Sequence, residues 1–301
     1  MEQEASEENE MAVSSEPEYS IWIVEYAHIL DFPTSGLLYG RHNAGTMVTP
    51  FCYALIRGAE HVVLVDTGHS NDEQGEARNT EGGISGWQSP EVTLGRLGVD
   101  PGTVDTVILT HGHFDHAGNV EAFPNARVYI QEREIQKLLW AKSLPKQLQW
   151  LMLAYDPEHL VGLVERWRQG QLVLLDGDAD VLPGIRAVAA HDTHTLGSQY
   201  VTVDDGRGAL WVLAGDNVYV WENLEGENGN GEFIPIGLVS GSIDQCLLTM
   251  EKMLGTVGGE TTHVLPFHEN LLWERFPSRL FDDGLHVAEI SRRSTDKSVV
   301  S

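Results

Sequence analysis

Short apolar runs rich in β-branched and aromatic residues recur through the first 130 residues and predict β-strands. These runs cover residues 21–26, 51–56, 61–65, 104–109 and 127–130. The polar, glycine-containing segment 57–60 separates the second run from the third and predicts a hairpin. The strand predicted over 104–109 leads directly into a segment that begins at His111.

Helical segments alternate with further strand-like runs in the rest of the chain. Residues 69–90 are polar and glycine-rich and predict a loop, and Ser89 with Pro90 predicts the cap and first turn of a helix to about Leu97. Ser242 similarly predicts the cap of a helix through about Leu254. Further strands are predicted over residues 172–175, 185–190, 200–203, 210–214 and 263–266. Because strands occur in runs with helices between them, the pattern predicts an α+β or layered α/β domain whose sheets are covered by helices.

Residues 134–167 form an apolar, aromatic-rich stretch that is predicted to be helical, with breaks at Pro145 and Pro157. Two interpretations of its apolar side chains stay open. They pack in the core or between helices, or they form a lid or a subunit contact that supplies an apolar wall of a substrate pocket.

Composition narrows the class of protein. The 301 residues include 42% hydrophobic residues, enough for a large core in one large domain or two small ones. The two cysteines, Cys52 and Cys246, exclude a disulfide scaffold. A formal net charge of −26 repels phosphate backbones and anionic headgroups, so we expect neither nucleic acid nor membrane as a partner.

The N-terminus is strongly acidic. Residues 1–18 contain seven Glu and no Lys or Arg, which predicts a disordered tail followed by a single domain over residues 19–301. This start has neither the basic region nor the apolar run of a signal peptide. We therefore expect a cytoplasmic protein.

The segment that follows the strand 104–109 carries the first candidate chemistry. It reads Thr-His-Gly-His-Phe-Asp-His-Ala over residues 110–117 and holds four ligand-type side chains, His111, His113, Asp115 and His116. A strand end that turns through Gly112 could direct all four toward one point. Imidazole and carboxylate together suit Zn, Fe, Mn or Co better than Ca or Mg.

More ligand-type residues follow later strand runs. His191 and His194 come after the run 185–190, Asp216 after 210–214, and His268 after 263–266. Loops at strand ends are common positions for functional sites because the scaffold beneath them is rigid. Each of these residues by itself is weak evidence for a metal site. Asp216 lies in a Gly-Asp-Asn turn, where its side chain could simply stabilise the turn.

Taken together, these residues resemble the metallo-β-lactamase superfamily. The resemblance rests on Asp66-Thr67-Gly68 after a strand, on the HxHxDH motif at residues 111–116, and on His194, Asp216 and His268 in that order. It covers nearly the whole chain after the acidic tail. It implies an αββα sandwich of two mixed sheets flanked by helices, with a metal centre at one edge.

The resemblance also implies a set of metal ligands. One ion would be held by His111, His113 and His194, the other by Asp115, His116 and His268, with Asp216 bridging the two. Asp66 would orient a ligand imidazole from behind. His191 competes with His194, which we prefer because His-Thr-Leu-Gly-Ser matches the family's His-Thr-x-Gly-Ser turn.

Within the superfamily, the chain is most similar to the branch of the N-acyl-homoserine lactonases. The commonest β-lactamases carry Cys at the bridging position, where this chain has Asp216. Tyr219, three residues later, matches a tyrosine that binds the substrate carbonyl oxygen in that branch, although a packed aromatic residue is the alternative. The resemblance does not identify the lactone.

The implied function is a dinuclear metal-dependent hydrolase, with zinc as the first choice of metal and iron, manganese or cobalt as alternatives. A hydroxide that bridges the metals would attack the lactone carbonyl. Tyr219 would stabilise the oxyanion, and Asp115 would carry a proton to the leaving alkoxide. The alternatives are a thioester, other ester or amide hydrolase similar to glyoxalase II, and an iron-dependent oxidoreductase. We expect a small lactone or ester as substrate and a homodimer as a possible assembly.

Overall fold

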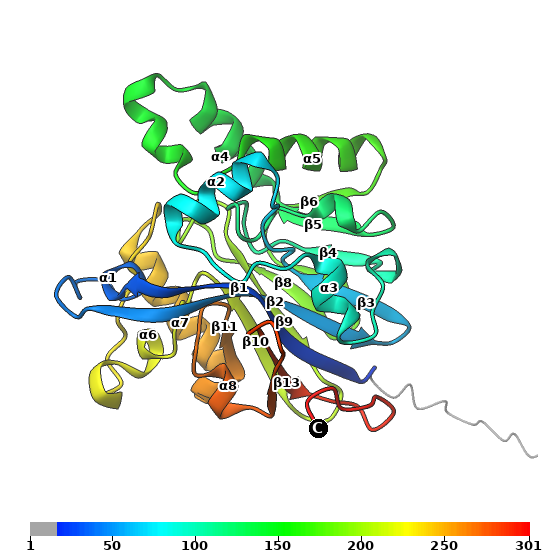
Figure 1. Cartoon of the computed structure of the whole chain (residues 1–301). Helices are drawn as coiled ribbons and strands as arrows, with labels where there is room; N and C mark the ends of the chain where they lie inside the picture. Colours follow the sequence, from blue (N-terminus) through cyan, green and yellow to red (C-terminus); the bar gives the residue numbers. More distant parts are fainter. Residues whose placement is uncertain (1–16) are drawn as a thin grey trace, which may run out of the picture.

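The computed structural model describes residues 17–301. The predicted disordered tail over residues 1–18 lies outside the described residues, apart from Pro17 and Glu18. Within them, two β-sheets pack face to face and helices lie on the outer faces of both sheets (Figure 1). The predicted sandwich with flanking helices is confirmed.

The larger sheet has eight strands in the order β12-β13-β1-β2-β3-β4-β5-β6. Their bounds are Tyr19–Pro33 (β1), Thr46–Gly58 (β2), His61–Val65 (β3), Thr106–Ile108 (β4), Arg127–Gln131 (β5), Leu172–Leu175 (β6), Ser278–Leu280 (β12) and His286–Ser291 (β13). Strands β3 to β6 are parallel, and β1 pairs antiparallel with both β2 and β13. The predicted hairpin joins β2 to β3 through Ala59 and Glu60, which both have positive φ.

The smaller sheet has five strands in the order β11-β10-β9-β8-β7. Their bounds are Ala179–Leu182 (β7), Ile185–Ala189 (β8), Gln199–Asp204 (β9), Leu210–Gly215 (β10) and Val264–Pro266 (β11). All pairs are antiparallel except β10 with β11, which is parallel. Strands β8, β10 and β11 therefore end at the same edge of this sheet.

Helices lie over both outer faces. Their bounds are Thr34–Leu37 (α1), Glu73–Gly82 (α2), Pro90–Gly95 (α3), Glu132–Ser143 (α4), Pro157–Arg168 (α5), Glu222–Glu225 (α6), Ile243–Thr256 (α7) and Leu272–Arg275 (α8). The predicted starts of α3 and α7 are confirmed, with Ser89 and Ser242 as their N-caps. The stretch 134–167 is helical with breaks at both prolines, and a 3₁₀ segment, Lys146–Met152 (η3), lies between α4 and α5.

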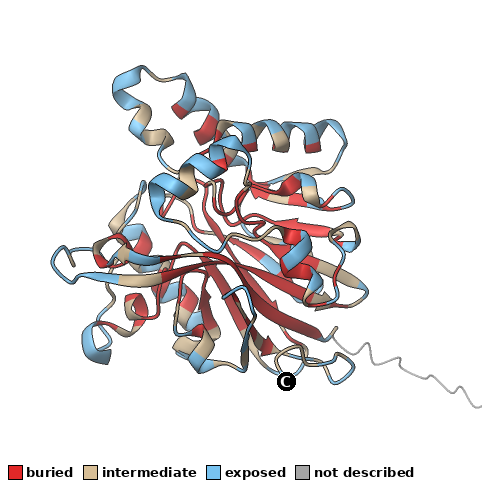
Figure 2. Cartoon of the chain, viewed as in Figure 1, coloured by how far each residue is buried: buried red, intermediate tan, exposed pale blue. Residues whose placement is uncertain are grey.

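Three apolar clusters follow from the alternation of side chains along the strands. In β1, Ile21 and Ile23 face the cluster between the two sheets, whereas Trp22 and Val24 face the outer cluster that also contains Leu94 of α3. On the outer face of the smaller sheet, Cys246, Met250 and Met253 of α7 are buried with residues of β8 to β11. Figure 2 shows this burial along the strands of both sheets.

One prediction about local structure needs correction. Residues 69–90 are not a continuous loop, because α2 occupies Glu73–Gly82 with the Asp72 side chain accepting a hydrogen bond from Gly75 N. This helix buries little apolar surface, so hydrophobic periodicity gives no sign of it. The strands β7, β12 and β13 and the short helices α1, α6 and α8 were not predicted from the pattern either.

The loops that carry the ligand-type residues converge at one edge of the sandwich. Asp66 follows β3, the HxHxDH segment follows β4, His194 follows β8, Asp216 follows β10 and His268 follows β11. Parallel strands of both sheets end at this edge, so the sandwich brings together side chains that are far apart in sequence. Within residues 17–301, no helix combines the length and the apolar character needed to span a bilayer.

Candidate metal centre

Seven buried side chains surround the candidate metal centre and form two groups that share Asp216. One group is His111, His113, His194 and Asp216, and the other is Asp115, His116, Asp216 and His268. Within each group the potential ligand atoms all lie within 4.8 Å of one another. The structure thus brings together all seven predicted ligands.

The Asp216 carboxylate faces both groups at once. Its Oδ2 lies 3.2 Å from His194 Nε2 and 3.7 Å from His111 Nε2. Its Oδ1 lies 3.0 Å from His116 Nε2 and 3.2 Å from His268 Nε2. Ligand atoms about 2.0–2.1 Å from a central zinc lie roughly 3.3 Å apart in a tetrahedron, which matches these separations.

The histidine rings are held by hydrogen bonds from their outer nitrogens. His116 Nδ1 donates to Asp66 Oδ2 at 2.6 Å, and His194 Nδ1 donates to the carbonyl of Leu238 at 2.8 Å. His268 Nδ1 donates in the same way to the carbonyl of Pro50 at 2.9 Å. Each Nε2 is therefore left unprotonated toward the centre, the arrangement that metal-binding histidines use.

Several inward-facing atoms have no hydrogen-bond partner. His111 Nε2, His116 Nε2 and Asp216 Oδ1 are buried and form no well-directed hydrogen bond within the described residues, although the last two atoms lie 3.0 Å apart. Unpaired buried polar atoms are costly, and three of them around one point indicate a bound group. His113 Nδ1 also lies 2.9 Å from His194 Nε2, and metal ions between such nitrogens would satisfy both lone pairs. The donor set and its geometry therefore fit two divalent metal ions.

The electrostatics of the centre reflect burial and close opposite charges. Burial lowers the pKa of His111 and His113 well below that of a free imidazole. For His116, burial opposes the charge, but the carboxylates of Asp216 and Asp115 outweigh it and raise its pKa. For Asp216, burial favours the neutral acid, but the surrounding imidazoles outweigh it and hold its pKa well below the usual range.

Asp66 supports the centre from behind. Its carboxylate is fully buried and also accepts hydrogen bonds from the backbone N and the hydroxyl of Thr110 at 2.7 and 2.8 Å. Asp66 has a φ of 66°, a left-handed conformation that Asp tolerates better than most residues. The predicted role of Asp66 in orienting a ligand imidazole agrees with its contact to His116.

His191 lies outside both ligand groups. Its Nε2 is 3.1 Å from Gln131 Oε1, and its ring is only half-buried. The loop after β8 turns so that His194, three residues later, enters the centre instead. The preference for His194 over His191 agrees with the geometry.

Tyr219 lies beside the centre. Its ring packs at 5.6 Å from that of His194 and 5.4 Å from that of His268, and its hydroxyl oxygen is 3.4 Å from His194 Nδ1. Burial, reinforced by the negative charges of Asp216 and Asp115, raises its pKa well above that of free tyrosine. Tyr219 therefore presents a protonated hydroxyl.

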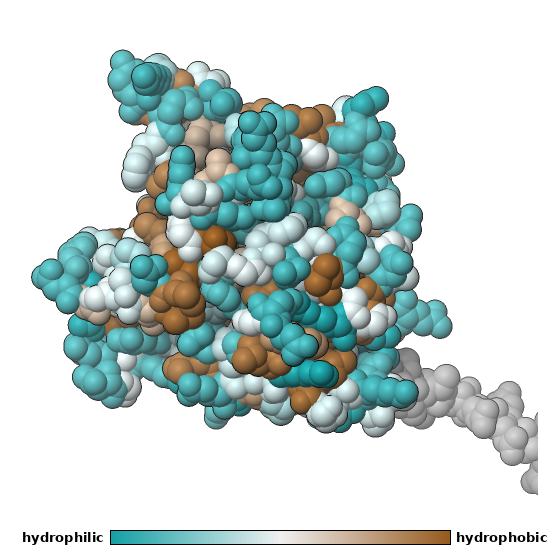
Figure 3. Space-filling model, in the orientation of Figure 1, coloured by the Kyte–Doolittle hydropathy of each residue, from teal (hydrophilic) through white to brown (hydrophobic). Residues whose placement is uncertain are grey.

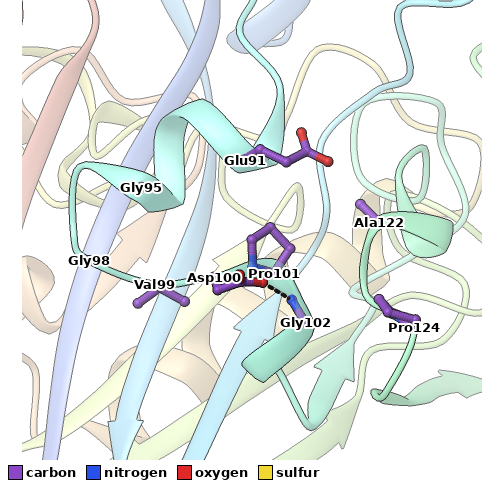
Figure 4. Close-up of a pocket in the computed structure, with 9 residues that line it drawn as sticks. All are labelled: Glu91, Gly95, Gly98, Val99, Asp100, Pro101, Gly102, Ala122 and Pro124. Carbon is purple, nitrogen blue, oxygen red and sulfur yellow. Dashed lines mark hydrogen bonds between the residues drawn. The ribbon is translucent and has the colours of Figure 1, made fainter.

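Two surface recesses lie outside the ligand groups. One recess of about 620 Å³ is lined by α3 and the segments around Asp100 and Pro124 (Figure 4). Another, of about 380 Å³, is lined in part by Val220 and Glu269, the residues that directly follow Tyr219 and His268. None of the seven ligand residues lines either recess.

Glu134 is a part of the site that sequence reasoning missed. It is fully buried in the first turn of α4. Its Oε1 accepts from Gly112 N at 3.0 Å, within the HxHxDH segment. Its Oε2 accepts from the Thr195 hydroxyl at 2.8 Å and from Gly197 N at 2.9 Å, beside His194. Glu134 therefore ties the two loops that supply the first ligand group.

The approach of these loops depends on glycine at position 197, where a Cβ would lie 2.2 Å from Glu134 N. Nothing in the sequence near Glu134 indicates its role, because it occupies an ordinary position at the start of a predicted helix. Its partners at Thr195 and Gly197 are more than sixty residues away in the chain.

Substitution Glu134→Gln is expected to weaken metal binding by about 10–100-fold, the usual cost of removing a group that supports metal ligands. The amide NH₂ cannot accept the hydrogen bonds that the carboxylate accepts from Thr195 or Gly197. Competition with a chromogenic chelator would measure the affinity. Glu132→Gln, at an exposed position of the same helix, is the control and should bind metal as the unmodified protein does. Unchanged affinity in Glu134→Gln would contradict this role.

Comparison with known proteins bears on the same residues. The family model described as the metallo-beta-lactamase superfamily matches residues 50–256, more than half of the chain. The chain belongs to the metallo-β-lactamase superfamily. His268 lies beyond the matched residues, so its place in the centre of this superfamily member comes from the geometry alone.

Several relatives within the superfamily are lactonases. An N-acyl homoserine lactonase of Bacillus cereus is 26% identical over 212 residues, which cover 65% of this chain and 77% of the relative. A probable metallo-hydrolase of Mycobacterium tuberculosis is 31% identical over 140 residues, 44% of this chain and 42% of that protein.

Solved structures share the fold. The structure of an N-acyl homoserine lactone hydrolase, with the product N-hexanoyl-L-homoserine at its catalytic metal centre, matches with a TM-score of 0.64 and 21% identity. The match covers 86% of this chain and 96% of that one. A dizinc quorum-quenching lactonase matches with a TM-score of 0.60 and 17% identity, over 92% of this chain and 95% of that one.

Proposed function

We propose that this protein is a dinuclear metal-dependent hydrolase that opens lactone rings. The observation that carries the proposal is the Asp216 carboxylate, whose two oxygens face two separate sets of buried ligand atoms. We assign His111, His113 and His194 to one ion, and Asp115, His116 and His268 to the other, with Asp216 between them. The unpaired inward nitrogens of His111 and His116 support this assignment. Zinc is the preferred metal because imidazole and carboxylate ligands suit it.

Two bound ions would act as Lewis acids and would lower the pKa of water in the site toward neutrality. The remaining roles belong to side chains of the chain itself. The Tyr219 hydroxyl donates to the substrate carbonyl oxygen, where negative charge develops as water attacks the carbonyl carbon; the ring C–O bond then breaks as the carbonyl re-forms. Asp115 accepts a proton during attack and returns it to the leaving alkoxide.

The position of Asp115 suits that role. Asp115 and His113 are the most exposed of the seven residues, at 7% and 8%, and we infer that substrate approaches the centre from their side. Asp115 Oδ2 lies 3.6 Å from His116 Nε2 and 3.7 Å from His268 Nε2. The hydroxyl of Tyr26 donates to the Asp115 carbonyl at 2.7 Å and holds its backbone in place.

The proposed substrate class is the N-acyl homoserine lactones. Relatives with this activity align over most of their length, and the structures that match with bound products carry N-acyl homoserines. Tyr219 lies three residues after Asp216, which is the spacing on which the resemblance to the lactonase branch rests. We further propose that residues 19–301 form the single catalytic domain.

Acid release on a panel of substrates tests the proposal. The metal-loaded protein is expected to hydrolyse N-acyl homoserine lactones and to leave a glutathione thioester and a phosphodiester largely intact. Preferential hydrolysis of the thioester would replace the lactonase assignment with a glyoxalase II-like one. Activity only with oxygen and a single bound iron would exclude hydrolysis.

Metal removal is expected to abolish activity and to lower the thermal unfolding temperature. Without ions, the buried imidazole nitrogens and the Asp216 carboxylate keep their desolvation cost but lose the cations that compensate it. Elemental analysis before and after dialysis against a chelator, with calorimetry on both samples, would check this. We expect two ions per chain before dialysis, and restoration of both properties on adding Zn²⁺. A chelated sample that stays active would contradict the metal assignment.

A further inference from the structure

The segment between α4 and α5 projects from the molecule and exposes apolar side chains. In Figure 1 this segment extends beyond the sheets at the upper left, and Figure 2 shows it mostly exposed. We define the arm as residues 137–153. Its exposed large hydrophobic side chains are Leu139, Trp140, Leu148, Trp150 and Leu153. Trp150, at 76% exposed, is the most exposed of them.

The neighbouring helix α5 adds a second apolar strip. Val161, Val164 and Trp167 are exposed at intervals of three residues, so they lie along one side of the helix. Together the arm and α5 hold half of the exposed large hydrophobic side chains of residues 17–301. Brown side chains along the upper edge of Figure 3 mark part of this surface. The apolar stretch therefore does not serve only to pack the core.

Charge distinguishes the arm from the rest of the chain. Residues 135–155 contain no Asp or Glu and hold three of the five lysines of a protein whose net charge is −26. Lys142 and Lys146 are exposed on the arm, whereas Glu158 and Glu165 are exposed on α5. Helix α5 is neutral overall, because it also holds Arg166 and Arg168, and the exposed Arg168 forms an ion pair with Glu165 at 2.7 Å. The arm is therefore basic, whereas α5 offers carboxylates without a net charge.

We propose that two copies of this chain pair about a two-fold axis, with the arm of each copy packed on α5 of the other. In such a pairing each arm meets the α5 of its mate, so the same contact forms twice. Apolar side chains meet apolar side chains, and Lys142 and Lys146 of one copy face Glu158 and Glu165 of the other. Arm on arm would bring the lysines of both copies together without a carboxylate between them, so charge favours arm on α5 over arm on arm.

The exposed area suits a stable interface. Trp140, Trp150 and Trp167 are each at least half exposed. Together they present roughly 300–500 Å² of apolar surface, since a whole aromatic side chain presents about 150–250 Å². The aliphatic side chains bring the total toward the roughly 800 Å² per partner of a standard interface. The largest apolar patch on a monomer is usually about 300–600 Å². Tryptophan is also among the residues that contribute most to binding energy at interfaces.

The arm leads directly into the metal centre. Phe114 N, in the HxHxDH segment, donates to the carbonyl of Ala154 at 2.7 Å. The rings of His113 and Tyr155 pack at 4.5 Å, and the Tyr155 hydroxyl donates to Glu134 at 2.9 Å. A dimer formed through the arm would therefore restrain Ala154 and Tyr155, which contact Phe114 and His113.

Sedimentation velocity over a concentration series tests the pairing on the full chain. The unmodified protein is expected to be a dimer at micromolar concentration, and Trp150→Ser with Trp167→Ser to raise the dimer Kd at least about tenfold for each tryptophan removed. Leu248→Ser with Leu280→Ser, at exposed positions elsewhere, is the matched control and should leave the Kd unchanged. Circular dichroism would show that all variants are folded. A monomer at every concentration, or an unaffected dimer in the tryptophan variant, would overturn the proposal.

Charge reversal tests which surfaces meet. Lys142→Glu with Lys146→Glu, or Glu158→Lys with Glu165→Lys, is expected to weaken the dimer about tenfold or more, and all four changes together to restore it. If the variant with all four changes does not regain the dimer affinity, the arm of one copy does not pack on α5 of the other. Monomeric protein that sediments with phosphatidylcholine–phosphatidylglycerol vesicles would identify a membrane surface as the occupant instead. These measurements need no substrate, so they stand or fall separately from the proposed lactonase activity.

Discussion

Substitution Asp216→Asn is expected to remove both metal ions and to lower hydrolysis by at least about a thousandfold, as loss of a member of a catalytic unit commonly does. Asp216 is the only residue that the two ligand groups share. An asparagine would keep one oxygen toward one group but would direct an NH₂ group, which cannot bind a metal ion, toward the other. It would also remove the negative charge that lies between four buried imidazoles.

Elemental analysis and lactone hydrolysis would be measured on the same preparation. Asp192→Asn is a suitable control, because Asp192 lies two residues before His194 but forms an ion pair with Arg133 at 2.9 Å and belongs to neither ligand group. The control should keep both ions and most of the activity. Two ions retained in Asp216→Asn would show that the carboxylate does not bridge them.

Substitution Tyr219→Phe is expected to lower kcat by about 10²–10³-fold while both metal ions remain bound, the usual cost of removing one hydrogen-bond donor to a developing oxyanion. The change removes only the hydroxyl, and the ring keeps its packing beside His194 and His268. Since that hydrogen bond strengthens as charge develops on the carbonyl oxygen, kcat should fall more than KM changes.

The control for Tyr219→Phe is Tyr200→Phe, a buried tyrosine of β9 that belongs to neither ligand group and whose ring centre lies 5.9 Å from Lys252 Nζ of α7. It should retain its metal content and its rate. Tyr219→Phe with an undiminished kcat would remove Tyr219 from the reaction. A loss of metal from the same variant would instead mean that the hydroxyl supports the centre through His194, from which it lies 3.4 Å.

The pattern of apolar and polar residues predicted the strands of both sheets well where these strands are buried and regular. The hairpin of β2 and β3 and the strands β4, β5, β8, β9 and β10 lie where the apolar runs indicated, because each run buries side chains in a continuous core. Elements with little apolar content were missed. Helix α2 buries only Gly75, and the edge strand β12 has largely exposed side chains, so neither leaves a periodic signal.

A metal site after the strand 104–109 could be inferred from the spacing of ligand-type residues along the chain. Four ligand-type residues lie within six positions at 111–116, and the strand that precedes them limits how they can be arranged. The residues that support these ligands gave no comparable signal. Glu134 contacts Thr195 at a separation of 61 residues, and the Pro50 carbonyl accepts from His268 at a separation of 218. Such contacts depend on how the two sheets pack.

The residue pattern was therefore enough to indicate a layered domain of covered sheets and ligand-type residues at its strand ends, because these depend on local spacing and on the burial of apolar strands. The αββα sandwich and the division of the ligands between two ions were implied by the resemblance to the metallo-β-lactamase superfamily. The folded chain decided which of His191 and His194 enters the centre, that Asp216 directs one oxygen to each ligand group, and that Glu134 ties two of the ligand loops. It also decided that the arm exposes its tryptophans rather than burying them. An apolar helical stretch has the same composition in either case, and only the packing of α4 and α5 against the sheet determines which of its sides faces solvent.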